Sequence, residues 1–149
     1  MRRHKRMPGK IEVDIALIDP DGMAFEAHMP SGHSLVMDAG EDAGGHNLGV
    51  RPMHLLLVGL AGCTAMDVIS FLRKMRQLVE AYQVVVEGER AEDHPKVYTR
   101  IRIRHIITGR VDERRLAHAI ELSETKYCSA KAMLGAVAKI ETEYEIRQA

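Results

Sequence analysis

Two cysteines, Cys63 and Cys128, are the residues of this chain best suited to nucleophilic or redox chemistry. Cys63 lies in the apolar segment GLAGCTAMDVISFLRK, where Gly59, Cys63 and Asp67 recur every four residues and would share one face of a helix. Cys128 precedes the segment SAKAML, near a helix N-terminus, where the helix dipole favours a thiolate. Two thiols in these positions predict either one redox site or two residues of the core.

Each cysteine also has a structural interpretation. Free cysteine is commonly buried, so Cys63 can be an inert thiol at a packed helix crossing. Gly59 and Gly62 each cost about 1 kcal/mol relative to alanine inside a helix, so either another backbone approaches there or the helix leaves space for a ligand. Cys128 or Ser129 can simply cap the following helix. Spacing alone leaves these alternatives open.

Other chemistries lack their usual motifs. The eight histidines form no His-x-x-x-His pair and the cysteines no Cys-x-x-Cys pair, so we expect no metal site and no cofactor. The segment GGHNLG lacks the lysine and the strand–helix context of a phosphate-binding loop. His105 is expected to be a core histidine. The alternating arginines Arg100, Arg102 and Arg104 predict a solvated sheet face more than an anion site.

The first half of the chain predicts strands followed by a long helix. Residues 10–18, 23–29 and 33–38 alternate with strand periodicity and are separated by the turn segments DPDG and PSG, which predicts an antiparallel meander. The glycine-rich segment 38–51 is expected to be a loop. Pro52 begins a predicted helix that runs to about residue 78. Its first half is apolar all round, so we expect it to be buried.

The second half predicts strands over residues 82–89 and 96–109, then a helix from the N-cap Asp112 to residue 126. A further helix over 129–140 and a strand over 141–146 complete the chain. The order βββ-α-ββ-αα-β lacks the regular alternation of a parallel α/β sheet. The predicted fold class is therefore α+β.

Composition excludes several classes of partner. Lys+Arg and Asp+Glu both number 21, so no global field attracts nucleic acid or an anionic membrane. Residues 1–10 are expected to form a basic flexible arm and residues 11–149 a single domain. The longest uncharged run, residues 52–66, is shorter than the about 20 apolar residues of a membrane span, and no secretory signal follows the arm. We expect a cytoplasmic protein with no nucleic-acid or membrane partner.

The segments GVRPMHLLLVGLAGCTAMDVISFLRK and AIELSETKYCSAKAML, in this order, resemble the OsmC/Ohr family of osmotically induced and organic hydroperoxide resistance proteins. The resemblance is closest to the YhfA-like branch. It implies an α+β fold in which antiparallel strands wrap around a long central buried helix, and an intertwined homodimer with its sites at the interface. It also implies that Gly59, Gly62 and Met53 line a pocket beside Cys63.

The same resemblance implies a thiol-dependent peroxidase. Cys63 would be the peroxidatic thiol that attacks an organic hydroperoxide, and Cys128 the resolving thiol that captures the sulfenic acid as a disulfide. A dithiol reductant would then restore the pair. The alternative is a dimeric protein of the same fold that binds a small apolar ligand or serves a structural role, without peroxidase turnover.

The sequence departs from the family's peroxidases at the two residues that activate the first cysteine. Those members carry a glutamate before the first cysteine that positions an arginine, and the arginine stabilises the thiolate. Met53 stands at the glutamate position, and no arginine occurs between Arg6 and Arg51. Arg51, His54 and Asp67 are the candidate activating or positioning residues in their place. The missing pair predicts slow turnover of hydroperoxides.

Overall fold

The computed structural model describes residues 9–148. The chain forms two compact units, one ending at Leu55 and the other beginning at Leu56. The predicted basic arm lies almost wholly outside the described residues, and the single domain over residues 11–149 stays a prediction.

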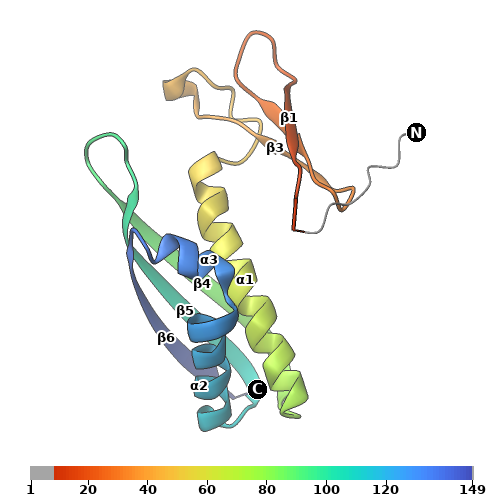
Figure 1. The fold of residues 1–149 in the computed structure, drawn as a ribbon, viewed down its shortest axis with the longest axis vertical. Coiled ribbons are helices and arrows are strands. Elements are labelled where there is room, and N and C mark those ends of the chain that lie inside the picture. Colours follow the sequence, from red (N-terminus) through yellow and green to blue (C-terminus); the bar gives the residue numbers. More distant parts are fainter. Residues whose placement is uncertain (1–8, 149) are drawn as a thin grey trace. The chain divides into compact units, whose positions relative to one another are not determined.

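The first unit contains the predicted antiparallel meander (Figure 1). Its strands are β1 (Asp14–Leu17), β2 (Phe25–His28) and β3 (Ser34–Met37), each shorter than the alternating segment that predicts it. Neighbouring strands pair in register, with Ile15 opposite Ala27 and Ala27 opposite Leu35. Ala27 is buried, whereas Ile15 and Leu17 of β1 remain exposed. The sheet therefore keeps an apolar face uncovered within one chain.

The glycine-rich loop after β3 is organised by one buried carboxylate, that of Asp38. Its oxygens accept backbone N–H groups from Ala39 at 2.7 Å, His46 at 3.1 Å and Leu48 at 3.0 Å. These hydrogen bonds, that from Leu48 foremost, lower the pKa of Asp38 below its ordinary value. A Cβ at Gly45 would fall 2.2 Å from the carbonyl oxygen of Ala39, so only glycine fits this close approach. A single turn, η1 (Glu41–Ala43), lies inside the loop.

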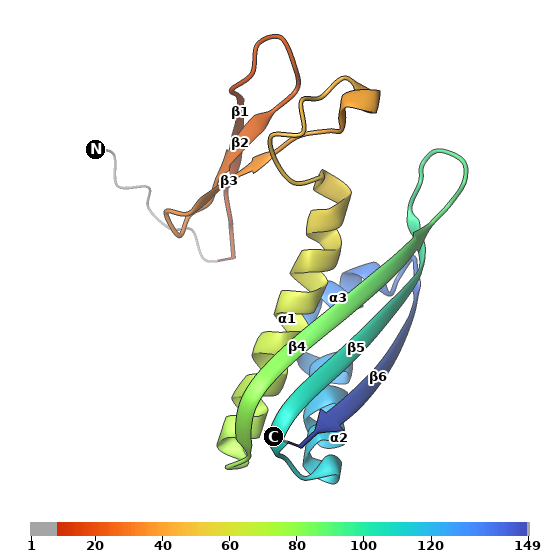
Figure 2. The ribbon, with the colours of Figure 1, turned by 180° about the vertical axis from the view of Figure 1, so that it is seen from behind.

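The second unit is a three-stranded sheet with helices on one face (Figure 2). Its strands are β4 (Leu78–Arg90), β5 (Tyr98–Arg110) and β6 (Lys139–Arg147). β4 and β5 are antiparallel, and β6 runs parallel to β5. The helices are α1 (Pro52–Lys74, whose residues from Leu56 on belong to this unit), α2 (Glu113–Leu122) and α3 (Ser129–Leu134). The long central strand β5 thus lies between two partner strands and beneath the helices.

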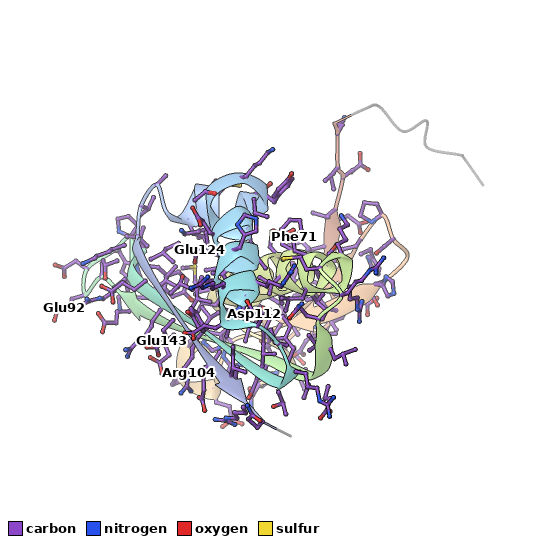
Figure 3. The ribbon with its side chains drawn as sticks, turned by 90° about the horizontal axis from the view of Figure 1, so that it is seen from below. Phe71, Glu92, Arg104, Asp112, Glu124 and Glu143 are labelled. Atoms are coloured by element: carbon purple, nitrogen blue, oxygen red, sulfur yellow. The ribbon has the colours of Figure 1, made fainter. Side chains whose placement is uncertain are left out.

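Alternation along β5 decides which face the helices cover. Ile101, Ile103 and Ile107 are fully buried together with His105. The intervening arginines are exposed, and two of them pair with β6, where Arg100 lies 2.7 Å from Glu141 and Arg102 lies 3.4 Å from Glu143. A shallow hollow on that outer face is lined by two arginines and two glutamates, with Val85. Figure 3 shows Arg104 and Glu143 on the side of the sheet turned away from the helices. The mixed charges support the solvated face over an anion site.

Helix α1 contributes a narrow buried stripe, made of the residues Leu60, Thr64, Val68 and Leu72. The C-terminal half of α1 packs with α2 and β5 in the core of the unit. The buried residues of this core are Val68, Leu72, Ile107, Leu116, Ala119 and Ile120. Val58 is 62% exposed and Met66 73% exposed. Within one chain, one sheet and one helix cover a single face of α1, so the expected burial of its other faces stays a prediction for an assembly of two chains.

Several predicted boundaries are wrong. Helix α1 ends at Lys74 instead of residue 78, because Arg76 adopts the left-handed conformation with φ 57° and β4 begins at Leu78. The helix after the N-cap Asp112 ends at Leu122 and continues as a π turn, η2 (Ser123–Tyr127). α3 ends at Leu134 instead of residue 140, since β6 begins at Lys139.

By length and apolar composition, α1 could cross a membrane. This is weak evidence, because the core helix of a soluble protein meets the same criterion. Asp67 lies within the helix and hydrogen-bonds to a neighbouring element.

Candidate active site

The structure brings both cysteines of the chain to one place in the second unit. The sulfurs of Cys63 and Cys128 and a carboxylate oxygen of Asp67 all lie within 4.8 Å of one another. Both cysteines are free thiols. A disulfide requires a sulfur–sulfur distance of about 2.05 Å, so the two thiols are close enough to join after a modest movement of their side chains.

The backbone on each side explains how the thiols meet. Cys63 precedes the buried Thr64 in α1 and is itself half-buried. Cys128 follows the π turn η2, and its backbone N–H donates to the carbonyl oxygen of Ser123 at 2.7 Å. Its sulfur accepts the backbone N–H of Lys131 at 3.4 Å, so Cys128 caps α3. The wider π turn lets the chain leave α2 and direct Cys128 toward α1, and such turns are frequent at functional sites.

A buried hydroxyl pair fixes the carboxylate beside the thiols. Ser123 Oγ donates to Asp67 Oδ2 at 2.9 Å and lies 3.0 Å from Thr64 Oγ1. A serine hydroxyl has one proton, so the Thr64 hydroxyl donates to Ser123. Thr64 and Ser123 are both almost completely buried. This chain of hydrogen bonds ties η2 to α1 and orients Asp67.

The two thiols differ in exposure and in electrostatics. Cys128 is 4% exposed, whereas Cys63 is partly open to solvent. Burial raises the pKa of the Cys128 thiol, and the neighbouring Cys63 and Asp67 raise it further, while the Lys131 N–H acts in the opposite direction. The prediction that the start of α3 favours a Cys128 thiolate is therefore wrong, because burial outweighs the hydrogen bond. Cys128 is a protonated thiol at neutral pH.

The two glycines predicted to line a pocket have space beside them. A Cβ built on Gly59 or Gly62 would meet no atom of residues 9–148 within 4 Å outside its own helix. No other backbone of the described part of the chain therefore approaches α1 closely at these two positions. The space is available to a ligand or to a second chain.

The remaining candidates precede Leu56 and so belong to the first unit. Arg51 donates from Nη1 to Asn47 Oδ1 at 2.8 Å and to the carbonyl oxygen of Gly49 at 3.0 Å, within its own loop. His54 is exposed on α1, and Met53 is partly buried. Their predicted roles as activating and pocket-lining residues stay predictions.

Ser123 and Thr64 are site residues that the sequence analysis missed. An aspartate inside an apolar helix needs a hydrogen-bond partner, and this was the available signal. The partner could not be named, because Ser123 looks like an ordinary residue of an amphipathic helix. The position of Ser123 depends on the π turn, which no residue pattern predicts.

His105 is a further buried titratable group of this unit. Its Nδ1 lies 2.6 Å from the hydroxyl oxygen of Tyr82, and the two rings stack with centroids 5.9 Å apart. Its Nε2 has no hydrogen-bond partner among residues 9–148. Burial lowers the pKa of His105 to about 4, so the ring is neutral. This agrees with the expected core histidine.

Comparisons with known proteins agree with this fold. Residues 44–143 match the family model described as OsmC-like protein. Protein YhfA of Escherichia coli K12 is 36% identical over 129 residues, which are 85% of this chain and 92% of YhfA. The crystal structure of a hypothetical protein from Aquifex aeolicus VF5 matches with a TM-score of 0.82 at 31% identity, covering 94% of this chain and 98% of that chain.

A more distant structure shares the fold. An organic hydroperoxide resistance protein from Elizabethkingia anophelis matches with a TM-score of 0.70 at 12% identity, covering 97% of this chain and 100% of that one. Together with the family match over residues 44–143 and the identity to YhfA, these findings confirm the resemblance noted in the sequence. The chain belongs to the OsmC-like protein family and has the α+β fold of the OsmC/Ohr proteins.

Proposed function

We propose that the protein is a thiol-dependent peroxidase that reduces organic hydroperoxides, with Cys63 as the peroxidatic thiol and Cys128 as the resolving thiol. The observation that carries this proposal is the pairing of an accessible sulfur with a buried one within 4.8 Å. A peroxide must reach the first sulfur, whereas the second has to reach only the first. The name of the Elizabethkingia relative, organic hydroperoxide resistance protein, supports the substrate class.

The proposed reaction has two steps. The Cys63 sulfur attacks the terminal peroxide oxygen, the O–O bond breaks, and the alkoxide leaves and takes up a proton to become the alcohol. Cys63 is then a sulfenic acid. The Cys128 sulfur attacks the Cys63 sulfur, the disulfide forms, and the hydroxyl group leaves as water with the Cys128 proton. The thiols lose two electrons and the hydroperoxide gains them; a dithiol reductant returns two electrons and two protons.

Electrostatics around the pair supports slow turnover. Asp67 brings a carboxylate to the thiols, and a nearby negative charge disfavours a thiolate. Arg51, the one candidate with a fixed positive charge, already donates to Asn47 and Gly49. We propose Arg51 and His54 as the residues to substitute in a search for the activating group.

We further propose that the chain acts as a homodimer in the cytoplasm. The exposed apolar residues of α1 and β1, together with the open space beside Gly59 and Gly62, support a second copy as their cover. The space beside the two glycines would then hold the apolar part of the hydroperoxide. Light scattering should report about twice 16.7 kDa; a stable monomer would remove the shared-interface part of the proposal.

Intact mass and peptide mapping test the assignment of the two thiols. After a small excess of an organic hydroperoxide, the wild type should lose two hydrogens per chain and yield a Cys63–Cys128 peptide. Cys128→Ser should instead gain one oxygen at Cys63. Cys63→Ser should show neither mass change. Recovery of only intermolecular disulfides, or an unchanged Cys63, would contradict the assignment.

The second candidate function is a dimeric protein of the same fold that binds a small apolar ligand, or serves a structural role, without turnover. The open space beside Gly59 and Gly62 favours it, as does the absence of the family's glutamate and arginine pair. A ligand that raises the melting temperature of the reduced protein and of Cys63→Ser equally, with no peroxide consumed, would support this candidate over the peroxidase.

A further inference from the structure

We propose that the reduced site binds a thiophilic divalent cation, with Zn²⁺ as the type case, through Cys63, Cys128 and Asp67. The three ligand atoms already lie within 4.8 Å of one another. Thiolate and carboxylate are both established zinc ligands. These three ligands match no usual zinc-binding sequence motif, because two of them are one helical turn apart on α1 and the third lies at the start of α3.

The geometry requires little movement. Tetrahedral zinc has Zn–S distances of about 2.3 Å and Zn–O distances of about 2.0–2.2 Å, which places its ligand atoms about 3.6–3.8 Å apart. Each pair of atoms therefore has to close by at most about 1.2 Å from its present upper limit of 4.8 Å. Three protein ligands with the fourth position left to water is the usual open zinc site.

The surroundings provide the second layer of hydrogen bonds that metal sites need. Ser123 Oγ donates to Asp67 Oδ2, which leaves the other carboxylate oxygen for the ion. The Lys131 backbone N–H donates to Cys128 Sγ, a contact that stabilises a coordinated thiolate. Cys63 and Asp67 are both partly exposed, so the ion has a path to the site.

Metal binding would control the redox chemistry of the pair, and this consequence rests on the proposed function. Both thiolates are engaged by the ion, so zinc should protect Cys63 from hydroperoxide. When oxidation does occur, the hydroperoxide takes two electrons from the two thiolates and, with two protons, becomes alcohol and water. The resulting disulfide has no thiolate left, so the ion is released.

The test is metal binding by the reduced full chain, measured with Zn²⁺ against a chromophoric chelator and with Co²⁺ by absorption. Wild type should bind about one ion per chain, and Co²⁺ should show thiolate charge-transfer and tetrahedral ligand-field bands. Cys63→Ser, Cys128→Ser and the Cys63–Cys128 disulfide should lose these bands. Asp67→Asn should bind at least about tenfold more weakly, and Ser123→Ala about 10–100-fold more weakly.

Asp93→Asn is the matched control, because Asp93 is an exposed aspartate in the β4–β5 connection. It should bind as wild type does, and circular dichroism should confirm that every variant is folded. No stoichiometric binding by the reduced wild type, or unchanged affinity in Asp67→Asn, would overturn the inference. Peroxide-driven disulfide formation is measured on the metal-free sample: its failure alone refutes the peroxidase, whereas failure of metal binding alone refutes this site.

Discussion

Ser123 determines how the reactive residues are held. Its hydroxyl joins Thr64 and Asp67 of α1 to the π turn that carries Cys128. All three groups are buried or partly buried, so an unmade hydrogen bond here costs more than it would at the surface. The position of Cys128 therefore depends on the hydrogen bonds of Ser123.

Replacement of Ser123 by alanine leaves the Thr64 hydroxyl without its acceptor and Asp67 without its donor. The free energy of unfolding should fall by about 1–3 kcal/mol, as for other buried groups left unpaired. Urea denaturation measures it, and Ser129→Ala, at an exposed position, should stay within about 0.5 kcal/mol of wild type. Equal stability of the two variants would show that this hydrogen-bond chain is unimportant.

His105 makes stability depend on pH. Its pKa falls from 6.5 in the unfolded chain to about 4 in the folded one because of burial, so the folded state excludes the proton that the unfolded state accepts. This contribution is fully present above pH 6.5 and is lost as the pH falls toward 4. The loss should approach about 1.4 kcal/mol per pH unit within this window.

Denaturant unfolding at several pH values, in wild type and in His105→Phe, measures this effect. Carboxylates titrate near the acid end of this window, so the difference between the two proteins isolates the histidine. The variant should have the shallower dependence between pH 6.5 and 4. Parallel curves would contradict the buried, neutral assignment of His105.

At the residue scale, the sequence predicted the thiols and Asp67 but not their hydrogen-bond partners. The recurrence of Gly59, Cys63 and Asp67 follows from helical spacing, which is local. The effect of burial on Cys128 is not local. It depends on how η2 and α3 pack against α1. The position of Cys128 at a helix start predicted a lowered pKa, whereas burial raises the pKa of this thiol.

Among the elements, α1 shows where local pattern and packing diverge. Its apolar composition predicts burial on all sides, yet one chain covers only the stripe from Leu60 to Leu72. The end of α1 was missed because Arg76, a residue with no special tolerance of positive φ, makes the left-handed turn. The order of all strands and helices was predicted correctly, since alternation and turn residues are visible in sequence.

Substitution of Gly62 by alanine tests whether a second chain covers the open side of α1. Among residues 9–148 of one chain an added methyl group meets no neighbour, so Gly62→Ala should stabilise the monomer by up to about 1 kcal/mol. If a second copy packs closely there, the same methyl group obstructs the interface. We expect the second effect to dominate and the dimer to dissociate at a higher protein concentration than wild type.

Sedimentation of Gly62→Ala and of the exposed control Lys74→Ala measures this effect. The control should dissociate as wild type does. A Gly62→Ala protein with raised stability and an unchanged dimer would mean that no chain approaches α1 at this glycine.

For the whole molecule, the sequence was sufficient to predict the family and the fold. Residues 44–143 match the family and the Aquifex structure shares the fold. In the proposed homodimer, activity would depend on how a second copy completes the surroundings of Cys63, and no local sequence pattern encodes that arrangement. Slow turnover is the consequence we expect from a thiol pair accompanied by Asp67 and lacking the family's glutamate.

Hydroperoxide consumption by the reduced protein with excess dithiol tests the central claim most directly. We predict that the wild type consumes well above one hydroperoxide per chain, at a slow rate. Cys63→Ser should consume none above background, and Cys128→Ser should be slower than wild type. Consumption that does not exceed one equivalent in wild type, or that continues unchanged in Cys63→Ser, would show that Cys63 is not a peroxidatic thiol.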